Sequence, residues 1–201
     1  MKMIIAESLL RSYTYDEYRK IVSDLLHQGL SSGDEQSDDL TNYSKLNDVR
    51  MHRLDKTMTI DETSIQQLLS LKGKYIWLVL SEGWCGDAAQ LLPIFNKMAL
   101  LAVAIDLKIV FRDENQELMN MFLTNGSKSI PKLLILEKET LEVLKNWGPR
   151  PKGATQLIKS YKEQYGIIDE TAKIELQMWY LQDKGLSTQK EIIDLMILIE
   201  N

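Results

Sequence analysis

The chain has 201 residues, of which 44% are hydrophobic and 26% charged, a composition typical of a globular protein with a buried core. Its formal net charge of -5 argues against a general nucleic-acid binder, which needs a basic face. The single cysteine, Cys85, excludes an intramolecular disulfide. With two histidines beside it, a typical structural zinc site is also excluded, and we expect no bound metal.

The N-terminal apolar run is too short for a signal peptide, and Glu7 interrupts it. No apolar stretch approaches the length of a membrane-spanning helix. We therefore expect a cytoplasmic protein without membrane or nucleic-acid partners, in a reducing compartment where a thiol stays available.

Residues 1–73 are predicted to be a helical N-terminal extension. Apolar periodicity and capping residues indicate three helices in it, over 14–28, 41–57 and 61–71. Thr14 and Glu17 have the pattern of a capping box at the start of the first helix. The second helix has a poor apolar stripe and a polar, basic side that includes Arg50 and Arg53.

The pattern changes at Lys74, and residues 74–165 are predicted to form an α/β domain. Four short apolar runs predict strands, over 75–80, 107–112, 132–136 and 141–147. Three helices are expected between and after them, over 86–101, 116–123 and 154–164. A tight turn at Lys138 and Glu139 implies an antiparallel hairpin. The element order therefore predicts a sheet that is parallel at first and then antiparallel.

Residues 166–201 are predicted to be a C-terminal helical extension packed on the core. Two helices are expected in it, over 170–183 and 188–200, with Thr188 and Glu191 as a capping box for the second. The apolar residues of the first helix are expected to dock on the core, with a dimer surface as the alternative. These residues are Met178, Trp179 and Leu181.

Cys85 lies in the motif Trp-Cys-Gly-Asp-Ala, directly before a predicted helix. Unpaired N–H groups and the helix dipole favour a negative charge there and lower the pKa of a thiol. Asp87 opposes this effect, because a nearby carboxylate raises the pKa. The sequence leaves this balance open. The alternatives are a small buried residue at position 85 and a purely structural carboxylate at position 87.

The element order and three local matches resemble the thioredoxin-like superfamily over about half of the chain. Trp84, Cys85 and Gly86 stand where that family has Trp-Cys-Gly-Pro-Cys, and the whole motif with its helical flanks is similar to a bacterial thioredoxin-like family. The resemblance implies a thioredoxin-like α/β fold, with a central mixed sheet of about four strands flanked by helices and with helical extensions at both ends.

Two further matches come from the second half of the domain. Ile130 and Pro131 resemble the family segment whose proline is cis and faces the active cysteine; without the resemblance, a trans turn proline is the alternative. Gly148 matches a family glycine that leaves space for a substrate chain. Trp84, Ile130 and Pro131 would then shape a groove for an extended peptide.

Three positions depart from the family pattern. Ala88 replaces the second cysteine, so a mixed disulfide at Cys85 needs an external thiol for its release. Val79 occupies the strand position of a buried aspartate that serves the second cysteine. Asp87 replaces the proline between the two cysteines.

Two functions follow from this pattern. One is a monothiol thiol–disulfide oxidoreductase, with Cys85 as the nucleophile, protein disulfides as substrates and glutathione or another low-molecular-weight thiol as co-substrate rather than bound cofactor. The alternative is a redox-inactive peptide- or protein-binding module that uses the groove beside Pro131. A one-cysteine peroxidase is disfavoured because Glu82 stands where such enzymes carry a threonine. Arg50 and Arg53 would either support a thiolate or an anionic partner, or form an ordinary solvated helix face.

Overall fold

The computed structural model describes residues 1–201 and contains one four-stranded sheet with the order β2-β1-β3-β4. The strands are β1 (Tyr75–Ser81), β2 (Ile105–Phe111), β3 (Lys132–Glu137) and β4 (Val143–Trp147). β1 pairs with β2 in parallel and with β3 in antiparallel orientation, and β3 pairs with β4 in antiparallel orientation. The predicted mixed sheet is therefore confirmed. The hairpin link is longer than predicted, because β4 begins at Val143 rather than at Leu141.

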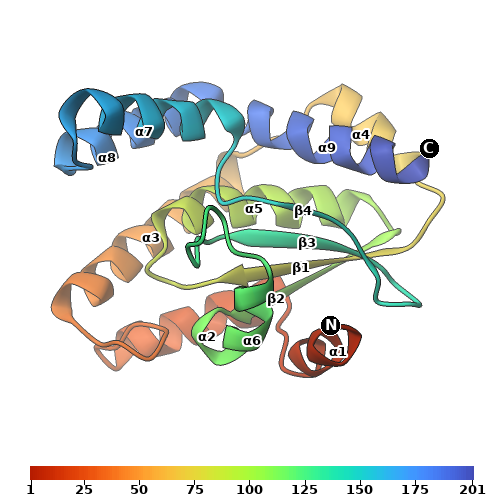
Figure 1. Ribbon diagram of the computed structural model, residues 1–201, viewed down its shortest axis with the longest axis horizontal. Coiled ribbons are helices and arrows are strands. Elements are labelled where there is room, and N and C mark those ends of the chain that lie inside the picture. The colour runs from red at the N-terminus through yellow and green to blue at the C-terminus, as the bar shows by residue number, and fades with distance from the viewer.

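Nine α-helices surround this sheet, and Figure 1 shows α1, α2 and α6 on one side of it and α4, α5 and α9 on the other. Their bounds are α1 (Lys2–Leu10), α2 (Tyr15–His27), α3 (Asp38–Thr57), α4 (Glu62–Leu69), α5 (Gly86–Leu101), α6 (Gln116–Met121), α7 (Lys152–Tyr165), α8 (Glu170–Asp183) and α9 (Leu186–Glu200). No helix combines the length and the apolar character needed to span a bilayer.

The core lies around the two central strands, which helices cover on both faces. All seven residues of β1 are buried, as expected for a strand without a solvent-facing side. Val79 sits in the middle of the sheet, opposite Ile109 of β2 and Leu133 of β3. Phe95 of α5 packs edge-on against Trp77, which joins the first helix after β1 to the sheet.

Helix α1 was not predicted, since its run of apolar residues lacks a side-chain cap and a clear polar face. The capping box expected at Thr188 and Glu191 is wrong. Helix α9 already begins at Leu186, with Gly185 as its N-cap, so Thr188 lies inside it and is buried. Glu191 instead accepts hydrogen bonds from Trp147 Nε1 (2.8 Å) and the N–H of Lys152 (2.7 Å), which ties α9 to β4 and α7.

The docking face expected for the helix at 170–183 is also largely wrong. Met178 and Leu181 of α8 are 47% and 54% exposed, and Trp179 is half-buried. The face that packs inward carries Ala172, Leu176 and Tyr180. Apolar side chains of α8 are thus left on its outer surface, where they matter for the site described below.

Helix α3 is held in place by an ionic cluster with α2. Arg19 forms ion pairs with Asp48 (2.9 Å) and Asp55 (2.5 Å), and Tyr15 donates a hydrogen bond to Asp55 (2.7 Å). Asn47 of α3 then donates from Nδ2 to the carbonyl oxygen of Gly83 (3.0 Å). These contacts position α3 against the loop that leads into α5.

That loop is also fixed from its other side by the buried carboxyl group of Glu82. The carboxyl accepts hydrogen bonds from Ser32 Oγ (2.5 Å) and the N–H of Asp113 (3.0 Å), and Ser32 Oγ accepts one from the N–H of Gly83 (2.8 Å). Burial raises the pKa of Glu82 to about 7, even though both hydrogen bonds lower it.

The raised pKa of Glu82 makes the stability of the protein depend on pH. The folded state binds this proton more tightly than the unfolded chain, so the stabilisation is present below about pH 4.5 and lost as the pH rises through 7. Gln at position 82 cannot titrate, so the variant should not share this loss. Between about pH 5 and pH 8 the unfolding free energy of the wild-type protein should fall by up to about 3 kcal/mol relative to that of Glu82→Gln. Urea unfolding at both pH values measures this shift. The exposed Glu114→Gln is the control, and a pH-independent difference for Glu82→Gln would contradict the expectation.

The anchoring of α9 by Glu191 gives a second stability prediction. Glu191→Ala leaves Trp147 Nε1 and the N–H of Lys152 without their acceptor, so we expect a loss of about 2 kcal/mol in unfolding free energy. The neighbouring Lys190→Ala removes only an exposed pair with Asp194 and should cost less than about 0.5 kcal/mol. Equal unfolding midpoints for the two variants would show that Glu191 is not an anchor.

Candidate functional site

Cys85 is the N-cap residue of α5 and lies where the loop after β1 enters that helix. Its Sγ accepts a hydrogen bond from the N–H of Ala88 (3.4 Å) and donates one to the carbonyl oxygen of Ile130 (3.3 Å). The Ile130–Pro131 peptide bond is cis, which confirms what the resemblance implied. Only 7% of Cys85 is exposed, so the thiol is placed as expected but is far less accessible than a free nucleophile.

The opposing influences on the Cys85 thiol can now be weighed. Burial raises its pKa to about 12, and the charge of Asp87 adds to this rise. The N–H groups of Ala88 and Asp87 and the charge of Arg150 lower the pKa but do not offset burial. The thiol is therefore protonated at neutral pH. Burial, rather than the contest between helix dipole and carboxylate, decides the outcome.

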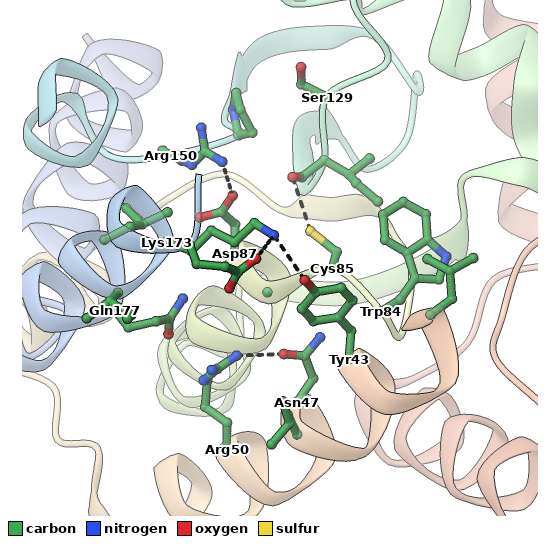
Figure 2. A pocket seen from close by; sticks show the side chains of 18 of the residues that line it. Tyr43, Asn47, Arg50, Trp84, Cys85, Asp87, Ser129, Arg150, Lys173 and Gln177 are labelled. Carbon is green, nitrogen blue, oxygen red and sulfur yellow. Dashed lines mark hydrogen bonds and ion pairs between the residues drawn. The ribbon is translucent and has the colours of Figure 1, made fainter. Parts of the chain in front are cut away.

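Asp87 joins three segments of the chain at the first turn of α5. Its carboxylate accepts a hydrogen bond from the hydroxyl of Tyr180 on α8 (2.8 Å) and pairs with Arg150 Nη2 (2.7 Å), which follows β4. Burial raises the pKa of Tyr180, and Asp87 adds to the rise. Burial lowers the pKa of Arg150, but Asp87 outweighs it, so both partners keep their protons. The carboxylate therefore has a structural role, which was one of the alternatives from the sequence, although its partners Tyr180 and Arg150 were not predicted. Figure 2 shows its pair with Arg150.

Gly148 is required by its own backbone surroundings. Its φ is +112°, and a Cβ atom there would lie 2.3 Å from the carbonyl oxygen of Pro131. The missing side chain thus makes room for the segment around Pro131. Pro131 is itself buried, so the groove expected beside it is not open there. Its neighbours Ser129 and Ile130 face the accessible space instead.

A cavity of about 700 Å³ opens next to Cys85, and Figure 2 looks into it. Helices α3 and α8 form two of its walls. The other walls are formed by the thiol loop, which we define as residues 84–87, and by the segments 128–130 and 149–150. Five basic side chains and two acidic ones line it, a formal charge of +3 in a chain whose net charge is -5. The basic residues are Arg50, Arg112, Lys128, Arg150 and Lys173; the acidic ones are Asp87 and Glu170.

Of the two arginines proposed to support an anion, the structure brings only one to the site. Arg50 lines the cavity and donates to Asn47 Oδ1 (2.6 Å). Arg53 is exposed and lines a different, smaller hollow. Trp84 and Gly86 are also at the cavity, as expected, and the guanidinium of Arg112 lies 4.9 Å from the Trp84 ring centre. Arg112 thereby packs on the ring of Trp84 at the cavity.

Several cavity residues were missed because they come from segments distant in sequence. Arg150 directly follows Gly148 and Pro149, and its closeness to the predicted site residue Gly148 was the one feature of the sequence that could have indicated it. Gln177 and Lys173 lie on a helix that was predicted, but the face of that helix that meets the site was not identified. The same holds for Tyr180, which reaches the site through its hydrogen bond to Asp87. No group of three or more His, Cys, Asp or Glu side chains is arranged to hold a metal ion.

Comparison with known proteins shows which family and which solved structures this chain is similar to. Residues 33–162 match a family model described as Thioredoxin. Two crystal structures are similar in fold: an HIV epitope scaffold (TM-score 0.57, 16% identity, 92% of this chain and 98% of that one) and a protein of unknown function from Pseudomonas aeruginosa (TM-score 0.53, 18% identity, 94% and 98%). No curated protein matches the chain.

The family match begins at Gly33, so it includes α3 and α4 together with the sheet and α5. Both crystal structures cover more than nine-tenths of this chain, so most of its terminal helical segments belong to the shared fold. Since the family match covers well over half of its residues, the chain belongs to the thioredoxin family.

Proposed function

We propose that this protein is a ligand-binding member of the thioredoxin family, which holds its ligand in the cavity between α3 and α8, beside a neutral Cys85 thiol. The observation that carries the proposal is the state of Cys85, which is buried, protonated and directed at this cavity. This proposal keeps the binding role that the sequence offered as the alternative, but it replaces the peptide groove beside Pro131 by a ligand cavity in front of Ile130.

The cavity has the properties of a ligand site. Its volume of about 700 Å³ falls in the range that takes small molecules, and apolar side chains share its lining with polar and charged ones. The polar groups come from several separate segments, and Asp87 with its partners Arg150 and Tyr180 joins three of these segments. Such a site is largely formed before the ligand arrives.

The redox chemistry of Cys85 is weakened in the same structure. Only a thiolate attacks a disulfide, and burial raises the pKa of Cys85 to about 12, which keeps the thiol protonated at pH 7. Ala88 stands at the position of the second cysteine, so no internal thiol releases a mixed disulfide. Both features slow an exchange cycle.

A monothiol oxidoreductase is the second candidate, favoured by the position of Sγ at the N-terminus of α5 and beside the cis Ile130–Pro131 peptide. The Cys85 thiolate would attack one sulfur of a protein disulfide or an extended peptide's disulfide, and the other sulfur would leave as a thiol after taking a proton. Glutathione or another low-molecular-weight thiol would then release Cys85. A reducing cytoplasm would supply that thiol.

The rate of Cys85 alkylation against pH tests the proposal. We expect slow labelling of the native protein, with a midpoint above the ordinary thiol value of about 8.5, because burial disfavours the thiolate. A rate unchanged by low urea would show that the folded state reacts. Fast labelling with a midpoint below that value would contradict the proposal and favour the oxidoreductase.

Asp87→Asn should lower the pKa of Cys85, because it removes a negative charge and leaves the positive charge of Arg150 unpaired. The amide oxygen still accepts from Tyr180. We expect the labelling midpoint to fall by about one unit, a roughly ten-fold faster reaction below the midpoint. Glu170→Gln, which changes a cavity carboxylate paired with Lys173, is the matched control and should leave the midpoint in place. A midpoint unchanged in Asp87→Asn would show that the carboxylate does not act on the thiol.

Ala88→Cys tests whether the local geometry is that of a dithiol site. The N–H of Ala88 already contacts Sγ of Cys85, so a thiol at position 88 should form a reducible disulfide with it. Intact mass after mild oxidation, with and without reductant, shows the loss and return of two hydrogens. Failure to oxidise in a folded variant would mean that the two side chains diverge.

A further inference from the structure

The basic side chains of the cavity differ in whether their charge is already neutralised. Three of them are paired with carboxylates: Arg112 with Asp113 (2.7 Å), Arg150 with Asp87 (2.7 Å) and Lys173 with Glu170 (2.5 Å). Arg50 and Lys128 have no carboxylate within 4.0 Å; Arg50 donates to the neutral amide oxygen of Asn47 and Lys128 to that of Gln116. Lys128 is exposed, whereas Arg50 is half-buried. Arg50 is therefore the one half-buried cation of the cavity whose charge has no counter-ion in the chain.

Arg50 lies next to the first turn of α5. A Cβ atom on Gly86 would lie 3.8 Å from Arg50 Nη1, so the guanidinium and this turn border the same space. The N–H of Gly86 has no acceptor in the chain, and the positive end of the dipole of this 16-residue helix faces there. Two independent sources of positive potential thus meet at Gly86.

The environment of Arg50 makes its lone charge costly. Burial lowers its pKa, and the like charge of Arg53 adds to the effect. A cation held partly out of water without a partner gains from an anion at hydrogen-bond distance. Neither Asp87 nor Glu170 supplies one, because Arg150 and Lys173 occupy them.

The remaining walls are apolar and open to solvent. Leu46 of α3 and Ile174 and Met178 of α8 line the cavity although each is more than 40% exposed. Leu40, Trp84 and Leu176 extend this lining inward. Exposed apolar side chains that gather at a cavity mark a surface that a partner with an apolar body covers.

We propose that the cavity binds a small organic anion with an apolar body, such as an aromatic or aliphatic carboxylate or sulfonate, whose charged group lies between Arg50 and the first turn of α5. The apolar body then covers the walls formed by α3 and α8. The size of the cavity selects a small molecule over a folded partner. This inference rests on the proposed function, since it names the ligand class of the same cavity.

Two dyes with the same rings separate the charge from the apolar body. Anilinonaphthalene sulfonate carries an anionic group, and N-phenylnaphthylamine lacks it. Fluorescence titration of the folded full-length protein should give saturable one-to-one binding of both, with the sulfonate bound at least ten-fold more tightly at low salt. Cys85→Ser should bind equally well, because the thiol does not contact the charged group.

Substitution of Arg50 locates the anion. Arg50→Met should abolish the preference for the sulfonate while leaving the neutral dye bound, and Arg50→Lys should restore most of it. Arg53→Met, one turn further along α3 and outside the cavity, is the matched control and should change neither affinity. If Arg50→Met does not fold, two measurements still test the charge. The wild-type preference for the sulfonate dye should be lost at high salt, and Arg50→Lys should retain that preference at low salt.

The outcomes separate this inference from the proposed function. Equal affinity for both dyes, or a sulfonate preference that survives in Arg50→Met, would overturn the anion site and leave a cavity for neutral ligands. Equal effects of Arg50→Met and Arg53→Met would overturn it as well, since the attraction would then be diffuse. Binding of neither dye would overturn both the anion site and the proposed ligand-binding function.

Discussion

The site depends on the buried carboxylate of Asp87. One oxygen accepts from Tyr180 on α8 and the other pairs with Arg150 behind β4, so a single side chain joins the first turn of α5 to two segments that lie far along the chain. This arrangement borders the cavity, and the charge of Asp87 adds to the rise in the pKa of Cys85 that burial mainly causes. A proline at this position, as in the dithiol relatives, could make none of these contacts. The replacement therefore changes what the site can do as well as its local charge.

Much of the central fold could be predicted because its signals are local. The continuous apolar run of β1 and the capping residues Thr14 and Asp61 each indicate their element without help from distant parts of the chain. Predictions failed where tertiary contacts decide. Glu191 looked like a helix cap but accepts from Trp147 and Lys152, and the apolar Met178 points away from the core because a cavity, not the core, adjoins that face.

The residues of the candidate site were also predictable only in part. The motif around Cys85 and the cis peptide at Pro131 followed from the sequence and the resemblance it carries. Arg150 and Tyr180 could not be assigned, since their roles depend on how α8 and the end of β4 meet α5. The sequence also left open the sign of the pKa change at Cys85. Its answer is set by burial, which arises from residues that no local pattern connects to the motif.

The hydrogen bond from Tyr180 to Asp87 has a consequence for the motion of the site. Because Asp87 lies two residues from Cys85 in the first turn of α5, this contact couples the position of α8 to the N-terminus of α5. Helix α8 also supplies one wall of the cavity. A displacement of α8 would therefore change the shape of the cavity and the surroundings of Asp87 together.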